Sequence, residues 1–230
     1  MKTIGLIGGL SWQSSIEYYR IINQQVSDRL GGLHSGKIVL VSLDFAQIEA
    51  MQEQERWQDV SFELVTAAKR AEAGGADFLL ICTNTMHMFA DQIQAAVSIP
   101  LLHIADATAN AVLAAGLTSV ALLGTRYTMD EDFYTKRLRN LHSLNVLIPN
   151  KQDRRIIDRV IYNELVLGEF NPESKEEYLR IIEGLVESGA DGVILGCTEI
   201  GLLVNETHLN VPVFDTARIH ALQAVELSLS

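Results

Sequence analysis

A polar motif that follows an apolar run occurs twice in this chain, and the two copies align without a gap. Residues 75–87 read GADFLLICTNTMH, and residues 189–201 read GADGVILGCTEIG. In each copy the apolar run is typical of a buried strand, and the hydroxyl, thiol and amide groups behind it lead into a helical pattern. Open parallel sheets bind ligands at the carboxyl ends of their strands, beside the N-termini of helices. The repeat therefore predicts two polar segments at which a strand leads into a helix. We call these segments corners and expect them to face each other across one cleft.

Other segments repeat in the same order around these two motifs. The apolar residues 3–7 and the glycines behind them are echoed by residues 119–125, and residues 99–103 are echoed by residues 211–215. Predicted strands alternate with helical patterns, which is typical of parallel sheets covered by helices on both faces. Such echoes alone are common in α/β proteins, but the ungapped Gly-Ala-Asp anchor favours an internal duplication. We therefore predict an α/β fold with two parallel sheets of roughly four strands each.

The duplication also predicts where the domains divide. No linker rich in proline, glycine or serine separates the halves, so the chain is expected to cross between them directly, near residues 104 and 215. We expect a first α/β domain of residues 1–103 and 215–230, and a second of residues 104–214.

Composition argues against several classes of partner. The formal net charge of −11 disfavours nucleic acid or an anionic membrane, because both require a basic protein surface. No stretch reaches the roughly 18 to 20 continuous apolar residues of a membrane helix, and the first residues lack the features of a signal peptide. Two cysteines in 230 residues do not form a disulfide framework. We therefore expect a cytoplasmic protein with a small-molecule partner.

The patterns of common metal and cofactor sites are also missing. The six histidines are dispersed, and His87 in the first motif has no paired ligand at helical or hairpin spacing. The dinucleotide fingerprint GxGxxG does not occur, and no lysine lies at the end of an apolar strand, where a Schiff base would form. We therefore expect chemistry without a metal and without a cofactor.

Cys197 offers the strongest chemistry in the two motifs. A thiolate is an effective carbon-acid base and nucleophile near neutral pH, and Cys197 lies where a strand is expected to become a helix. We expect the amides of the next helical turn to lower its pKa. Cys82 precedes the position that aligns with Cys197, so its side chain should point to the other side of its strand and pack. His87 is either a donor behind the site or a packed residue.

Four segments carry a resemblance that spans nearly the whole chain. The chain resembles the aspartate/glutamate racemase superfamily in these segments. They are CTNTMH at residues 82–87, GCTEIG at residues 196–201, LIGGLSW near the start and LLGTRYTM at residues 122–129. Within this superfamily the chain is most similar to an enterobacterial branch of amino-acid racemases specific for L-aspartate and L-glutamate. The resemblance implies two pseudo-twofold-related α/β domains, an active site in the cleft between them, no pyridoxal phosphate and a homodimer.

The resemblance also implies a mechanism of two proton transfers. Members usually carry a cysteine at each of the two strand ends, but Thr83 stands at the first one here, as it does in the L-specific branch. A hydroxyl is too weak an acid to serve as a standing base at neutral pH, yet it can deliver a proton to a carbanion. Cys197 is therefore expected to remove the Cα proton of L-glutamate or L-aspartate, and Thr83 to deliver a proton to the opposite face.

Neighbouring polar residues are expected to bind the substrate. The side chains expected to donate hydrogen bonds to its α-carboxylate are Asn84, Thr85 and Thr198. Glu199 is expected to contact the ammonium group. Gln52, in the predicted loop after the second strand, is either a substrate contact or an exposed polar residue.

Two alternatives to this racemase hypothesis remain open. Some archaeal-type relatives use an arginine and a lysine where this chain has Met51 and Val166, so no cation for a side-chain carboxylate is evident. The chain is therefore also compatible with another enzyme of the superfamily, such as a hydantoin racemase, a decarboxylase or a maleate isomerase. A third hypothesis is a two-lobed protein that binds a small ligand without catalysis.

Overall fold

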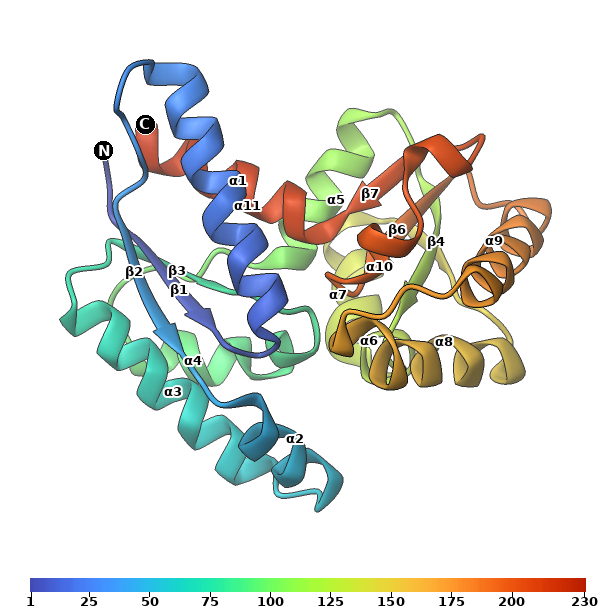
Figure 1. Cartoon of the computed structure of the whole chain (residues 1–230), viewed down its shortest axis with the longest axis horizontal. Helices are drawn as coiled ribbons and strands as arrows, with labels where there is room; N and C mark the ends of the chain where they lie inside the picture. Colours follow the sequence, from blue (N-terminus) through green and yellow to red (C-terminus); the bar gives the residue numbers. More distant parts are fainter. The chain divides into compact units, whose positions relative to one another are not determined.

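The computed structural model describes residues 1–230 and contains two parallel β-sheets flanked by helices (Figure 1). The chain divides into two compact units. The first comprises Met1–Ile104 and His220–Ser230, and the second comprises Ala105–Ile219. No helix combines the length and the apolar character that crossing a membrane requires.

The sheet of the first unit has three parallel strands in the order β2-β1-β3: β1 (Ile4–Gly8), β2 (Ile38–Ser42) and β3 (Phe78–Ile81). Instead of a fourth strand, the segment that begins at Pro100 forms one isolated bridge, between Leu79 and Leu101. Pairing stops there because the chain enters a helix at Ile104.

Helices cover both faces of this sheet. They are α1 (Trp12–Leu30), α2 (Phe45–Glu53), α3 (Trp57–Ala73), the 3₁₀ turn η1 (Thr85–Phe89), α4 (Ala90–Ala96) and the last part of α11 (Thr216–Leu229). The alanines of α3 pack against Ile7, Leu79 and Ile81 on one face, and Figure 1 shows α3 running along the sheet. On the other face α1 lies so close that a Cβ added to Gly8 would approach Ser15 Oγ to 2.6 Å.

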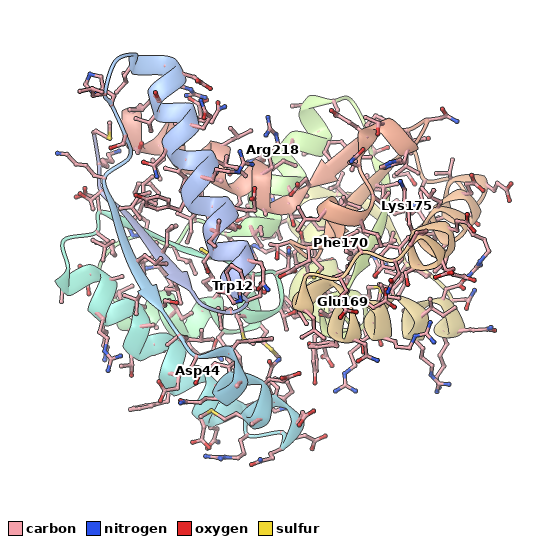
Figure 2. All side chains as sticks on the ribbon, viewed as in Figure 1. Trp12, Asp44, Glu169, Phe170, Lys175 and Arg218 are labelled. Carbon is pink, nitrogen blue, oxygen red and sulfur yellow. The ribbon has the colours of Figure 1, made fainter.

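Local capping sets where α1 and α2 begin. Gly9, with φ +72°, turns the chain after β1, and its N–H donates to Ser15 Oγ at 2.8 Å. Ser11 then caps α1, because its Oγ accepts from the N–H of Ser14 at 3.3 Å. Asp44 caps α2 in the same way through Ala46 N–H, and Figure 2 labels this residue together with Trp12, the exposed first residue of α1.

The sheet of the second unit has four parallel strands in the order β5-β4-β6-β7. They are β4 (Ser119–Gly124), β5 (Asn145–Leu147), β6 (Gly192–Gly196) and β7 (Val213–Asp215). Its helices are α5 (Ile104–Ala114), α6 (Arg126–Asp130), α7 (Asp132–His142), α8 (Lys151–Asn163), α9 (Pro172–Glu187), α10 (Ile200–Leu203) and the 3₁₀ turns η2 (Leu165–Leu167) and η3 (Glu206–His208). The inner strands β4 and β6 are almost entirely buried, as expected for parallel strands covered on both faces.

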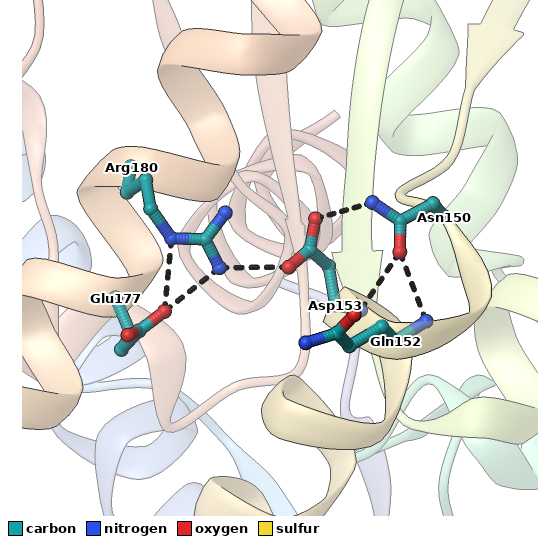
Figure 3. Close-up of polar contacts among 5 residues, drawn as sticks. All are labelled: Asn150, Gln152, Asp153, Glu177 and Arg180. Atoms are coloured by element: carbon teal, nitrogen blue, oxygen red, sulfur yellow. Dashed lines mark hydrogen bonds and ion pairs between the residues drawn. The ribbon is translucent and has the colours of Figure 1, made fainter.

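Helices α8 and α9 pack on one face of this sheet and are also joined by polar contacts. Asn150 Oδ1 caps α8 by accepting from the N–H groups of Gln152 and Asp153 (Figure 3). The Asp153 carboxylate accepts from Arg180 of α9 at 2.7 Å, and Arg180 also binds Glu177. These contacts connect the start of α8 to the middle of α9.

The predicted fold class is confirmed, since two parallel sheets flanked by helices are present. Each duplicated motif contains a strand that pairs with the first strand of its unit. In the first motif this is β3, which pairs with β1, and in the second it is β6, which pairs with β4. The polar ends of both motifs therefore lie at the carboxyl edge of a sheet.

Cys82, at the end of β3, should contribute to stability. It is fully buried, burial raises its pKa, and its N–H donates to the carbonyl of Ile7 at 2.9 Å. Cys82→Ala leaves a small cavity, so we expect the free energy of unfolding to fall by about 1–2 kcal/mol in urea titrations. Leu33→Ala, at a fully exposed side chain, is the control and should change stability by less than about 0.5 kcal/mol. Equal stability of the two variants would show that Cys82 packs without consequence.

Candidate active site

The second motif places a thiol against a carboxylate. Cys197 follows β6 and is only 9% exposed, and its Sγ donates to Glu199 Oε2 at 3.0 Å. The Thr198 hydroxyl donates to the same oxygen at 2.7 Å, and Glu199 is itself buried. The carboxylate therefore holds the thiol proton in a hydrogen bond.

These neighbours raise the pKa of the Cys197 thiol well above its ordinary value. Burial is the largest cause, and the charge of Glu199 and its hydrogen bond to the thiol add to it; Asp158 contributes as well. The backbone N–H of Glu199 does lower the pKa of Cys197 through a hydrogen bond, but burial and the carboxylates outweigh it, so the prediction of a lowered pKa is wrong. The following helix, α10, is only one turn long and begins at Ile200, so it offers little to oppose burial and a nearby negative charge.

Residues at the end of β4 lie beside this thiol corner. Gly124 pairs with Gly196, so Thr125 and Cys197 each come one residue after a paired position. A Cβ added to Gly124 would lie 2.9 Å from the carbonyl oxygen of Gly196, which shows how closely the two strand ends approach. Thr125 caps α6 by accepting from Thr128 N–H at 3.3 Å. Strand pairing thus sets Thr125 and the following Arg126 next to the motif of Cys197.

Arg126 is a cation that the sequence analysis missed. Its guanidinium donates to the Tyr127 hydroxyl at 2.6 Å and lies 4.7 Å from the centre of that ring. It takes part in none of the ion pairs of the chain. Its backbone N–H donates to Asp158, the same carboxylate that raises the pKa of Cys197. The signal available in the sequence was an arginine directly after the hydroxyl that ends an apolar strand.

The first motif places a free hydroxyl at the end of β3. Thr83 is half-buried, and its hydroxyl forms no hydrogen bond within the protein, whereas its carbonyl accepts from His87 Nδ1 at 2.8 Å. The next residues, Asn84 and Thr85, are buried and begin the 3₁₀ turn η1. The Thr83 hydroxyl is thus available to a ligand.

Gln52 lies in α2 rather than in the predicted loop. Asp44 at the N-cap explains this difference, because it starts a helix earlier than the apolar pattern indicated. Gln52 is buried, which disagrees with one of its two predicted alternatives, that of an exposed polar residue.

The predicted site residues therefore form two groups. One consists of Thr83, Asn84 and Thr85, with Gln52, in the first unit, and the other of Cys197, Thr198 and Glu199 in the second. Neither group includes a metal site, since no cluster of three or more His, Cys, Asp or Glu side chains is arranged to hold an ion.

Comparisons with known proteins agree with one another. A model of the Asp/Glu/hydantoin racemase family matches residues 7–224. A crystal structure described as a candidate Asp/Glu racemase from Yersinia pestis is 50% identical, with a TM-score of 0.94 and 100% of both chains covered. An aspartate racemase homologue from Pyrococcus horikoshii OT3 is 35% identical, with a TM-score of 0.87 and the same coverage of 100% of each chain. The broad specificity amino-acid racemase RacX of Bacillus subtilis is 24% identical over 170 residues, which are 73% of this chain and 71% of RacX.

Replacing Glu199 should make the thiol more acidic. Glu199→Gln removes a negative charge that raises the pKa of Cys197, so this pKa should fall. A fall of one unit gives about tenfold more thiolate at any pH below the pKa. We expect iodoacetamide to alkylate the Cys197 peptide correspondingly faster at pH 7, as measured by mass spectrometry. Glu206→Gln, at an exposed carboxylate of η3, should leave the rate unchanged. Equal alkylation of both variants would contradict an electrostatic role for Glu199.

Proposed function

Because the chain belongs to the Asp/Glu/hydantoin racemase family, we propose that it is a racemase that acts on L-glutamate and L-aspartate without a cofactor. The observation that supports this most directly is the thiol of Cys197 hydrogen-bonded to Glu199 at the end of β6. A buried thiol with an adjacent proton acceptor can exchange a proton with a carbon acid. The unpartnered hydroxyl of Thr83 is a second proton-transfer group, at the end of β3.

The proposed reaction transfers one proton from the α-carbon and returns one to it. The thiol proton of Cys197 first moves along its hydrogen bond to Glu199, and the thiolate then removes the Cα proton of the L-substrate. Thr83 delivers its hydroxyl proton to the opposite face of the carbanion. Its alkoxide regains a proton from solvent while Glu199 releases one, so protons and charge balance. Thr83 serves here as an acid, because its hydroxyl cannot persist as an alkoxide at neutral pH.

The raised pKa of Cys197 fits a role in both directions of this reaction. It keeps the resting group a thiol, which is the form that donates a proton to a carbanion. Once the proton has moved to Glu199, the same high pKa makes the thiolate a strong base. Since two enantiomers have equal free energy, a reversible racemase has the same kcat/KM from either side, and the unlike pair of acids affects only individual steps.

The polar neighbours are proposed to bind the substrate. Donors to its α-carboxylate are Asn84, Thr85 and Thr198, with Gln52 as a further contact in the first unit. We assign the side-chain carboxylate to Arg126, whose guanidinium has no ion pair and follows the end of β4. An arginine suits this role because it can bind a carboxylate with two hydrogen bonds.

Variants of Thr83 and Cys197 should separate exchange from inversion. Thr83→Ala should abolish inversion of L-glutamate in heavy water but retain deuterium exchange at Cα, because Cys197 still removes and returns a proton on one face. Cys197→Ser should lower both rates by about 10²–10⁴-fold. Thr83→Cys should raise kcat/KM from both enantiomers alike, because a thiol is a stronger acid than a hydroxyl, and so make racemisation of D-glutamate and D-aspartate readily detectable. Proton NMR measures exchange and chiral chromatography measures inversion. Inversion by Thr83→Ala at the parent rate would exclude Thr83 as the second acid.

Arg126 should control preference for an acidic side chain. Loss of a charge-assisted hydrogen bond costs about 1.5–3 kcal/mol, so Arg126→Met should lower kcat/KM for L-glutamate by roughly 10–100-fold. The neutral analogue L-glutamine should lose far less, and Arg126→Lys should recover part of the preference. The matched control is Arg155→Met, at an exposed arginine of α8 that forms no ion pair. Equal losses for L-glutamate and L-glutamine would contradict this assignment.

A further inference from the structure

His87 is held between two backbone groups in the first unit. It is 2% exposed; its Nδ1 lies 2.8 Å from the carbonyl oxygen of Thr83, and Ile104 N–H donates to its Nε2 at 3.2 Å. A carbonyl only accepts and a backbone N–H only donates, so Nδ1 carries the hydrogen and Nε2 carries none. The ring is therefore neutral and in a single tautomer. Both nitrogens are engaged, which leaves neither to transfer a proton to a substrate.

A second histidine fixes the segment that His87 binds. His220 is fully buried, and its Nε2 donates to the carbonyl of Leu102 at 2.9 Å, while its Nδ1 accepts from the Tyr18 hydroxyl at 2.8 Å. Burial, followed by the neighbouring His87, lowers the pKa of His220 to about 3. Its ring centre lies 5.7 Å from that of His87. A continuous series of contacts thus runs from Tyr18 of α1 through His220 and the backbone of residues 102–104 to His87.

This series ends on the backbone of Thr83. The hydroxyl of Thr83 has no hydrogen-bond partner in the protein, so its position depends on the backbone and on the χ1 rotamers that this backbone allows. The only hydrogen bond to the Thr83 carbonyl from a side chain comes from His87. An error of about 1 Å in the placement of a reacting group can lower a rate by about 100-fold. A contact that fixes this carbonyl therefore has a direct effect on proton delivery.

We propose that His87 is a positioning residue for Thr83: it ties the Thr83 carbonyl to the segment that His220 anchors, and so aims the hydroxyl at the α-carbon. This inference rests on the proposed function, in which Thr83 donates the second proton. It assigns His87 no contact with the substrate.

Two substitutions of His87 separate its two hydrogen bonds. In His87→Asn the side-chain amide N–H replaces Nδ1–H and retains the bond to Thr83, but Ile104 loses its acceptor. In His87→Gln the amide oxygen replaces Nε2 and retains the bond to Ile104, but the Thr83 carbonyl loses its donor. We expect His87→Gln to lower inversion of L-glutamate at least about tenfold, while Cα deuterium exchange stays within about threefold of the parent. His87→Asn keeps the bond to Thr83 but loses the one to the anchored segment at Ile104, so it should also lower the ratio of inversion to exchange, by less than His87→Gln does.

Each outcome of this experiment decides the proposal. A purely structural role would lower inversion and exchange together and leave their ratio unchanged in both variants, and that result would overturn it. An unchanged ratio in His87→Gln alone would do the same. A parent protein that neither exchanges nor inverts any acidic amino acid would instead refute the proposed function, and this inference with it.

The parent protein provides a test that does not depend on the folding of a variant. With ¹⁵N-labelled histidine at pH 7, the ring shifts of His87 should report the neutral form with hydrogen on Nδ1. Hydrogen on Nε2, or a protonated ring, would be incompatible with the donor to Thr83 and the acceptor from Ile104, and would overturn the proposal.

Discussion

The close approach of β4 and β6 at their carboxyl ends is the constraint on which the thiol corner depends. Gly124 and Gly196 pair there, and a Cβ on either would come within 2.9 Å of backbone on the other strand. Because neither residue has a side chain, the next residues of both strands emerge side by side. The first unit has a comparable requirement after β1, where a Cβ on Gly9 would collide with the backbone of Leu43. In both units, then, glycines without a side chain let two backbone segments approach closely, and this keeps the polar residues that follow close to the sheet.

Electrostatics in the second unit follow from that compactness. Cys197 and Glu199 are buried beside each other, and the carboxylates of Glu199 and of the half-buried Asp158 both oppose ionisation of the thiol. A racemase needs a group that can both give and take a proton, and a thiol kept neutral beside an acceptor is suited to that alternation. The hydroxyl of Thr83 lacks such a neighbour. The two motifs therefore have similar backbones but different side-chain chemistry, with a thiol beside a carboxylate in one and an unpartnered hydroxyl in the other.

The sequence predicted the fold class and the location of both corners, because the duplicated motifs combine a strand pattern with polar residues at a fixed offset. The predictions that failed concern properties that depend on how side chains are oriented and packed in the folded chain. The pKa of Cys197 is raised, although the sequence predicted that it would be lowered. Burial and the carboxylate of Glu199 have a larger effect on it than the amides of one short helical turn. Gln52 was assigned to a loop because the apolar period around it is weak, whereas the side-chain cap of Asp44 starts a helix there. No local pattern could show that His87 binds Ile104, because tertiary packing creates that contact.

The isolated bridge at Leu101 gives the two buried histidines a further meaning. In a fourth strand, the carbonyl of Leu102 and the N–H of Ile104 would have been satisfied by a sheet ladder. Here His220 and His87 supply one donor and one acceptor in its place. Each neutral imidazole, with a donor on one side and an acceptor on the other, acts as a surrogate peptide group. Because these two side-chain hydrogen bonds replace those of a sheet ladder, strand pairing can end after a single bridge. The chain can then turn at once into α5, and neither backbone group is left unsatisfied.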